Sequence, residues 1–359
     1  MKRFALWGGM AIAVLILILS ITNASWLAPD PKGAPKQIAH RALAPELIGT
    51  TGDRNAECAS PMVAPPVHDH LPNTKASILR ADRMGGWLIE VDAMVTADGI
   101  AVLHSESDLS CLTDGKGALN GTSLEQLQTL DAGYGYSVAE VASEAGKTPF
   151  RGKAAVIPTL EEILTAIPPR GRLMVHLASD DPALIDAVAA AYRAAGRDPE
   201  ERGDAFYGDA AAIGRIREVY AGIWAFNPDA ARQCTADYTV SGWTGMLPSS
   251  CRGRTMLISL DDQTLLWGWP NRLIARMEAY DGEILIEGPV SKASGPVHGI
   301  TLPEQLTEIP SSFNGYVWTD DAFTTLPPLI PRFDNRTQEE IDAAQAALER
   351  RRKDQRVDQ

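Results

Sequence analysis

Short apolar runs alternate with helical patterns along most of the chain, and this alternation constrains the fold more than any other feature. The strand-like runs are "QIAHR", "WLIEVDAM", "IAVLHS", "RLMVHLA", "DAFYGDA", "AGIWAF", "EILIEGP" and "GYVWTD". Amphipathic or Ala-rich stretches such as "TLEEILTAI" and "PALIDAVAAAYRAAG" lie between several of them. Apolar strands separated by helices are typical of a parallel sheet covered on both faces. The pattern predicts a TIM (β/α)8 barrel, with a doubly wound open sheet as the alternative.

Residues 4–21 form an uncharged apolar segment directly after Lys2 and Arg3. Its length is close to that of a bilayer-spanning helix, and positive residues before such a segment stay in the cytoplasm. We therefore expect residues 1–24 to be a signal anchor or a cleaved signal peptide. The rest of the protein would then lie in the cell envelope, anchored to the inner membrane and facing the periplasm, or be secreted. A buried globular helix is the alternative, although the segment has no polar face.

The remaining chain divides by composition into three parts. Residues 25–36, "SWLAPDPKGAPK", are rich in Pro, Gly and Ala and are typical of a linker. Residues 37–330 carry the alternating pattern and are predicted to form the barrel domain. Residues 331–359 are predicted to form a charged helical tail with no catalytic task. The formal net charge of −13 argues against a nucleic-acid partner, because such binding depends on clustered Lys and Arg.

Polar side chains are concentrated at the ends of the predicted strands, which form the active-site face of a barrel. His40 and Arg41 close the first strand, and His104 closes the third. Glu90 and Asp92 point to the same side of the second strand, because successive side chains alternate between faces. Two inward-facing carboxylates in an apolar strand need a partner or a metal. A salt bridge with Arg41 is the alternative to a metal site.

These residue types suit the chemistry of a phosphate ester. Paired carboxylates are hard oxygen ligands for Ca²⁺ or Mg²⁺. A metal ion and Arg41 would offset the negative charge on the phosphoryl oxygens. His40 and His104 could divide the work of general acid and general base. Each histidine alone is compatible with a structural role, and the indication comes from their meeting on one predicted face.

The chain resembles the glycerophosphodiester phosphodiesterase family. The resemblance rests on "IAHRALAPE", "NTKASI", "WLIEVDAMVTADGIAVLHSESDLSCLTDGKG", "TSLEQLQTLDAGYGY" and "IPTLEEIL", which follow one another in the family's order. It covers residues 37 to about 180 and is looser at "GYVWTDD". The resemblance implies a barrel that hydrolyses glycerophosphodiesters with a divalent metal. It makes His40 and His104 the acid and base, Arg41 a phosphate ligand, and Glu90 and Asp92 metal ligands.

The chain departs from this family at three positions where the family has a charged residue. Pro72 stands where the family has a Glu, after an inserted segment at 47–71, and Glu46 is a replacement ligand in our interpretation. His176 and Ala178 stand where the family has Glu and Lys. His176 could bind the metal, and its softer nitrogen adds Mn²⁺ or Zn²⁺ to the candidate ions. Ala178 supplies no replacement for the lysine.

Further candidates lie outside this set. Glu287 in "ILIEGP" is a reserve metal ligand, and Trp318 in "GYVWTD" is either barrel packing or a platform for substrate. Four cysteines in an exported protein tend to pair. We favour pairing Cys58 with Cys111, since both should lie near the active-site mouth, and Cys234 with Cys251, which are close in sequence.

The sequence thus predicts a metal-dependent phosphodiesterase that releases glycerol 3-phosphate and an alcohol. One alternative is a sphingomyelinase D-like phospholipase acting on lysophospholipids. Another is a catalytically degenerate barrel that binds phospholipid headgroups or an envelope protein. The expected partners are therefore a glycerophosphodiester or lysophospholipid substrate and the membrane.

Overall fold

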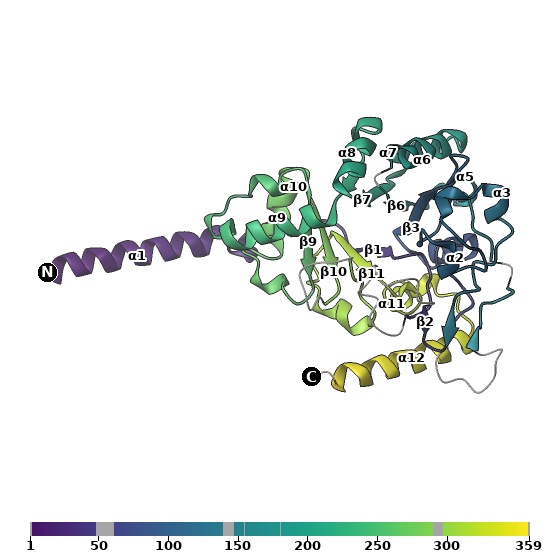
Figure 1. The fold of residues 1–359 in the computed structure, drawn as a ribbon. Coiled ribbons are helices and arrows are strands. Elements are labelled where there is room, and N and C mark those ends of the chain that lie inside the picture. The colour runs from purple at the N-terminus through teal and green to yellow at the C-terminus, as the bar shows by residue number, and fades with distance from the viewer. Residues whose placement is uncertain are drawn as a thin grey trace. The chain divides into compact units, whose positions relative to one another are not determined.

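The computed structural model describes residues 2–47, 61–138, 147–153, 155–179, 181–289 and 297–357 (Figure 1). The chain divides into two compact units. The smaller unit comprises residues 1–36, 228–298 and 304–318. The larger unit comprises residues 37–227, 299–303 and 319–359. The domain boundaries predicted from composition stay predictions.

The larger unit is built on a parallel sheet in the order β8-β7-β6-β3-β1. Its strands are β1 (Lys36–Ala39, of which Lys36 counts with the smaller unit), β3 (Leu88–Val95), β6 (Leu173–Leu177), β7 (Ala205–Gly208) and β8 (Trp224–Phe226). The register places Asp92 of β3 beside His176 of β6, and His176 beside Tyr207 of β7. Three polar side chains on neighbouring strands thus stand at the same level of the sheet.

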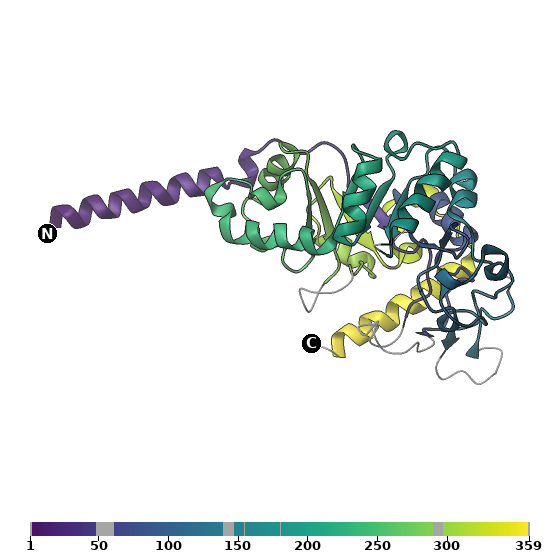
Figure 2. The same cartoon turned by 45° about the horizontal axis from the view of Figure 1, so that its top comes forward.

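Helices follow these strands as expected for a parallel sheet. They are α2 (Lys75–Arg83), α3 (Leu124–Leu127), α5 (Leu160–Ala166), α6 (Pro182–Ala194), α7 (Pro199–Arg202), α8 (Ala210–Val219), α11 (Ala322–Leu329) and α12 (Gln338–Val357). Helices α6 and α8 pack together and contact β3 and β7, respectively (Figures 1 and 2). Thr159 caps α5 by accepting a hydrogen bond from the Glu162 backbone, and the Glu162 side chain returns the interaction.

A large apolar cluster lies between the sheet and its helices. It includes Ile78 of α2, Leu160 of α5, Tyr192 of α6 and Phe206 of β7, all fully buried. Burial of such side chains is the main favourable contribution to folding. It also fixes the strands that carry the polar groups of the site.

The smaller unit contains β9 (Thr255–Ser259) and β10 (Glu283–Glu287), and most of β11 (Tyr316–Thr319). These strands pair in parallel in the order β11-β10-β9. Helices α1 (Lys2–Thr22), α9 (Pro228–Ser241) and α10 (Asn271–Glu278) belong to the same unit. The predicted disulfide between Cys234 and Cys251 is present. Cys58 lies outside the described residues, so its pairing with Cys111 stays a prediction.

In the part of the chain whose side chains are described, no helix combines the length and the apolar character needed to cross a membrane. The signal-anchor interpretation of residues 1–24 stays a prediction.

Among the described residues the two units contribute eight parallel strands to the TIM-barrel-like architecture that the alternation predicts, and β2 (Met62–Val63) and β5 (Ser137–Val138) form a separate pair. One predicted barrel strand is wrong. The run "IAVLHS" forms β4 (Ala101–Leu103), which pairs antiparallel with β3. Residues 96–100 between these strands are too few for a parallel crossover. The eighth parallel strand is β9, whose short run "TMLIS" the strand pattern did not single out.

Candidate active site

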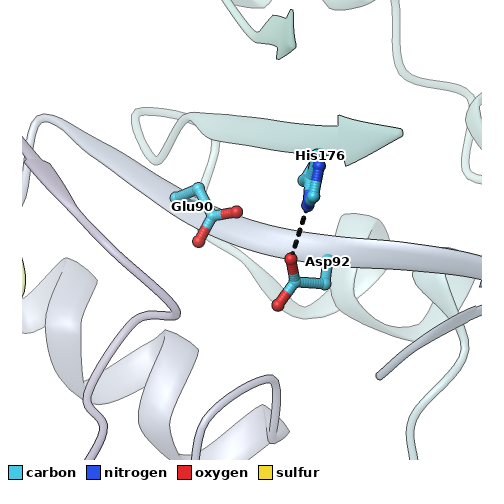
Figure 3. Close-up of side chains that lie close together, drawn as sticks. All are labelled: Glu90, Asp92 and His176. Carbon is cyan, nitrogen blue, oxygen red and sulfur yellow. Dashed lines mark hydrogen bonds and ion pairs between the residues drawn. The ribbon is translucent and has the colours of Figure 1, made fainter. Parts of the chain in front are cut away.

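Glu90, Asp92 and His176 form the centre of the candidate site (Figure 3). Glu90 and Asp92 lie two residues apart on β3 and are almost completely buried. His176 comes from the neighbouring β6, and one ligand atom from each residue lies within 4.8 Å of the others. The strand alternation and the parallel register together create this cluster. It contains two oxygen donors and one nitrogen donor that could hold a metal ion.

Asp92 is held by contacts on both carboxylate oxygens. Its Oδ1 is 2.7 Å from His176 Nδ1, and its Oδ2 accepts a hydrogen bond of 2.9 Å from Asn73 Nδ2. The Asp92 backbone N–H donates to Asn73 Oδ1 at 2.9 Å, and Arg41 Nε lies 3.6 Å from Oδ2. Burial raises the pKa of Asp92, but the His176 hydrogen bond and the Arg41 charge outweigh it and hold that pKa far below its usual range.

Glu90 lies in a different electrostatic environment. Its Oε1 accepts a hydrogen bond of 2.7 Å from the Tyr207 hydroxyl, and its Oε2 accepts one of 2.7 Å from the Arg41 backbone N–H. Burial and the nearby Asp92 carboxylate raise the pKa of Glu90. The Tyr207 ring also stacks on His176, with ring centroids 4.4 Å apart. Tyr207 therefore contacts two of the three potential metal ligands.

A tight backbone turn presents the His40-Arg41 step to this cluster. Arg41 and Ala42 have φ angles of 53° and 61°, in the left-handed region that non-glycine residues rarely occupy. Such a conformation costs about 1–2 kcal/mol per residue. The turn points the Arg41 N–H at Glu90 and its guanidinium toward Asp92, so both carboxylates stabilise it. Sequence reasoning predicted the dipeptide but not the strain.

His40 pairs with a carboxylate that sequence reasoning did not select. Its Nδ1 lies 2.7 Å from Asp320 Oδ1, and its Nε2 lies 3.9 Å from Glu90 Oε2. Burial lowers the pKa of His40, whereas the charges of Asp320 and Glu90 raise it. The two charges outweigh burial, so the pKa lies above its usual value. Asp320 follows β11 in "VWTDD", so its place at a strand end was the available signal.

His104 directly follows β4, which pairs with β3 next to Asp92, and its side chain is buried. Its backbone N–H donates to the Asp92 carbonyl at 3.0 Å. Its Nε2 is buried and has no hydrogen-bond partner among the described residues. Burial lowers the pKa of His104 to about 4. A cavity beside it is lined by Asn73, Tyr136 and Ile157, among others. Near neutral pH His104 therefore faces this cavity as an uncharged imidazole.

Asn73 and Tyr207 are the other site residues that sequence reasoning missed. Asn73 begins the quoted "NTKASI" motif, and Tyr207 lies in the strand "DAFYGDA". The motif places Asn73 at a helix start and the strand pattern places Tyr207 in a strand, but neither indicates which carboxylate each would contact.

The structure gives the surroundings of three further predicted site residues: two carboxylates face arginines, and one tryptophan is buried. The Glu46 carboxylate is 2.8 Å from Arg351 Nε, and Glu46 is not part of the Glu90-Asp92-His176 cluster. Glu287 lies in the smaller unit, where Arg232 Nη2 holds it at 3.0 Å. Trp318 is fully buried and contributes packing rather than a platform for substrate. Glu46 and Glu287 each face an arginine that already neutralises them.

Solved structures that resemble this chain indicate its fold. The glycerophosphoryl diester phosphodiesterase domain of the uncharacterised protein Rv2277c from Mycobacterium tuberculosis gives a TM-score of 0.58 at 21% identity, covering 82% of this chain and 99% of that domain. An Oleispira antarctica phosphodiesterase in complex with the product sn-glycerol-3-phosphate gives 0.51 at 19% identity, covering 84% and 98%. These structures show a shared fold.

The family model described as the Glycerophosphoryl diester phosphodiesterase family matches residues 67–182. In sequence, the Rv2277c protein is 35% identical over 156 residues, which cover 41% of this chain and 50% of that protein. The bovine Glycerophosphodiester phosphodiesterase 1 is 41% identical over 64 residues, covering 18% and 19%. The chain thus spans about half the length of the mycobacterial relative. Residues 67–182 thus match the family that the sequence resembles, and the relatives support membership in it.

The environment of His104 predicts how the stability of the metal-free protein depends on pH. The unfolded chain binds a proton at His104 below about pH 6.5, whereas the folded chain does so only near pH 4. The free energy of unfolding should therefore fall as the pH drops through this window, by about 3 kcal/mol from this residue. Urea denaturation in EDTA from pH 7.5 to 4 measures it. His104→Gln should flatten the slope, and an equal slope in that variant would contradict the assignment; His298→Gln, at an exposed histidine, is the control.

The Tyr207 hydroxyl predicts a second stability effect. Tyr207→Phe leaves Glu90 Oε1 buried without its 2.7 Å donor. We expect the free energy of unfolding to fall by about 1–3 kcal/mol at pH 7. Tyr134→Phe removes an exposed tyrosine hydroxyl of the same unit and should change it by less than about 0.5 kcal/mol. Equal stabilities for Tyr207→Phe and the wild type would show that the hydrogen bond does not support Glu90.

Proposed function

We propose that this protein hydrolyses glycerophosphodiesters to glycerol 3-phosphate and an alcohol, with a divalent metal and with His40 and His104 as acid and base. The observation that carries the proposal is the meeting of two buried carboxylates, one arginine and three histidines at the carboxyl ends of neighbouring strands. A phosphodiester needs charge neutralisation and proton transfer, and this group supplies both.

The donor set fits a divalent ion. Glu90 and Asp92 are buried together, and the pKa of Glu90 is raised by burial and by Asp92, so a cation bound between them would relieve their repulsion. We propose that Glu90, Asp92 and His176 hold this ion, with Asp92 and His176 exchanging their mutual hydrogen bond for it. One nitrogen among the ligands favours Mn²⁺ or Zn²⁺ beside Mg²⁺ and is less suited to Ca²⁺. When bound, the ion would polarise a phosphoryl oxygen.

The remaining residues provide binding and proton transfer. Arg41, fixed through its backbone to Glu90, would bind a second phosphoryl oxygen. One histidine removes a proton from the attacking water while the other donates a proton to the leaving alcohol oxygen. A P–O bond to water forms as the P–O bond to the alcohol breaks. Asp320 orients His40 by holding its Nδ1, which directs Nε2 toward Glu90 and the phosphate site.

Two charged residues of the family are missing from this chain, and their loss should affect the rate of hydrolysis. Ala178 supplies no lysine, and Pro72 lines the cavity beside His104 without a carboxylate. Transition-state stabilisation then depends on Arg41 and the metal. These losses keep the degenerate barrel, which binds a headgroup or an envelope protein without turnover, as the alternative. A location in the cell envelope, with residues 1–24 as signal or anchor and the membrane as a partner, also stays part of the proposal.

The test is the release of glycerol 3-phosphate by the purified full-length protein. Glycerophosphocholine, glycerophosphoethanolamine and lysophosphatidylcholine are supplied with Ca²⁺, Mg²⁺, Mn²⁺, Zn²⁺ or EDTA. We expect turnover that requires a divalent ion. His40→Ala should lower kcat by about 10²–10⁴-fold, the usual contribution of a general acid or base. His298→Ala, at an exposed histidine, should leave kcat unchanged.

Product analysis separates the alternatives. A cyclic phosphate from lysophosphatidylcholine, seen by ³¹P NMR, would replace hydrolysis with the sphingomyelinase D-like reaction. A folded protein that releases no product with any of these ions would favour the degenerate barrel.

A further inference from the structure

Arg351 in the C-terminal helix α12 is buried although it carries a charge. Only 9% of its surface is exposed, and Ala344 and Ala347 of the same helix are buried as well. The described part of α12 thus packs against the rest of the larger unit and is not a solvated tail. A guanidinium is rarely buried unless it is paired, so its partners indicate what holds this helix in place.

Three groups surround the guanidinium, and each comes from a different segment of the larger unit. Nη1 donates to the Asp321 carboxylate and, at 2.9 Å, to the Thr301 carbonyl. Nε lies 2.8 Å from Glu46 Oε1. Burial lowers the pKa of Arg351, but the two carboxylates raise it well beyond its usual value, so the side chain stays charged.

Both carboxylates lie in the segments that carry the catalytic groups. Glu46 follows the His40-Arg41 turn after β1, and its carbonyl accepts a hydrogen bond of 2.8 Å from the Ala64 backbone. Asp321 follows β11 and is directly bonded to Asp320, the partner of His40. One arginine therefore links the loop that carries the histidine to the loop that carries its carboxylate.

The Asp321 contact is also rigid. Its Oδ1 accepts a hydrogen bond of 3.1 Å from the Thr324 backbone and caps α11, while its Oδ2 binds Arg351. The Asp320 backbone N–H donates to the Ile300 carbonyl at 3.0 Å, next to the Thr301 carbonyl that Arg351 also binds. Arg351 thus contacts Asp321, the neighbour of Asp320, and Thr301, the neighbour of the residue whose carbonyl holds the Asp320 backbone.

We propose that Arg351 is a positioning residue for the reaction. By binding Glu46 and Asp321 it sets the separation of the His40 and Asp320 loops, and α12 is therefore part of the catalytic apparatus. This inference rests on the proposed function. It replaces the expectation of a tail with no catalytic task. It also gives Glu46 a role in place of metal binding.

A second ion pair of α12 provides a matched control. Arg80 Nη2 lies 3.3 Å from Glu340 Oε2 near the start of the helix, and Arg80 also donates to the Asn335 carbonyl at 3.3 Å. This pair ties α12 to α2, and neither Glu340 nor Asn335 adjoins His40 or Asp320 in sequence. Its removal should loosen the helix without moving the catalytic loops.

The experiment compares Arg351→Met, Arg351→Lys and Arg80→Met in the full-length protein, with glycerophosphocholine and the ion that supports the highest rate. Arg351→Met should lower kcat by about 10–100-fold, because a displacement near 1 Å can cost that much. KM and the affinity for the ion should stay within about threefold, a split that general loss of structure does not produce. Arg351→Lys should recover part of kcat, and Arg80→Met should keep the wild-type kcat.

A proton NMR readout makes the test independent of turnover. The downfield Nδ1–H signal of His40 in its hydrogen bond to Asp320, assigned by its loss in His40→Ala, should shift or broaden in Arg351→Met and persist in Arg80→Met. If Arg351→Met does not fold, Glu46→Gln removes one partner only and should lower kcat and shift the signal in the same direction. An unchanged kcat and an unchanged signal in the Arg351 variants would overturn the inference. The wild type could show no turnover while the His40 signal is shifted or broadened in Arg351→Met and unchanged in Arg80→Met. That result would overturn the proposed function but not the positioning role of Arg351.

Discussion

The site depends on two carboxylates, Glu90 and Asp92, that share one buried face of β3. Two negative charges close together in an apolar interior are unfavourable without compensation. The surrounding groups supply that compensation: Arg41 contacts both residues, His176 and Asn73 bind Asp92, and Tyr207 binds Glu90. The need to neutralise this pair explains why polar side chains from several strands converge here.

The same constraint accounts for the strained turn after β1. Two successive non-glycine residues with positive φ are costly and persist only where other contacts fix them. The Arg41 N–H donates to Glu90 while the guanidinium approaches Asp92, so the turn is held at two points. This geometry brings a cation and the His40 imidazole to the carboxylates from one short segment. The strained backbone is thus a consequence of Arg41 contacting Glu90 and Asp92 at the same time.

Much of this arrangement could be predicted from the sequence. Alternation within "LIEVDAM" places Glu90 and Asp92 on one face, and parallel pairing of adjacent strands brings His176 to them, because side-chain direction and strand ends follow directly from local pattern. Tyr207, Asn73 and Asp320 were missed as partners. Their contacts depend on register and on loop conformation, and these are set by tertiary packing rather than by local preference.

The other differences between expectation and structure have physical causes of the same kind. Glu46 and Glu287 were plausible ligands because a carboxylate near a strand end can face the barrel mouth. In the structure each is neutralised by an arginine, Arg351 and Arg232, from a distant segment. Likewise, β4 has a strand's composition, but the short connection after β3 forces it to pair antiparallel. Such long-range pairings cannot be derived from one chain's local pattern.

We infer that Glu90, Asp92 and His176 form a site for one divalent ion, and a binding measurement tests this without depending on turnover. Calorimetric titration of the EDTA-stripped full-length protein with Mn²⁺, and separately with Zn²⁺, gives the stoichiometry and the affinity. We expect one ion per chain and a loss of binding in both Asp92→Asn and His176→Phe, with binding retained in the surface variant Asp229→Asn. Undiminished binding in the first two variants, or no binding by the folded wild type, would contradict this inference.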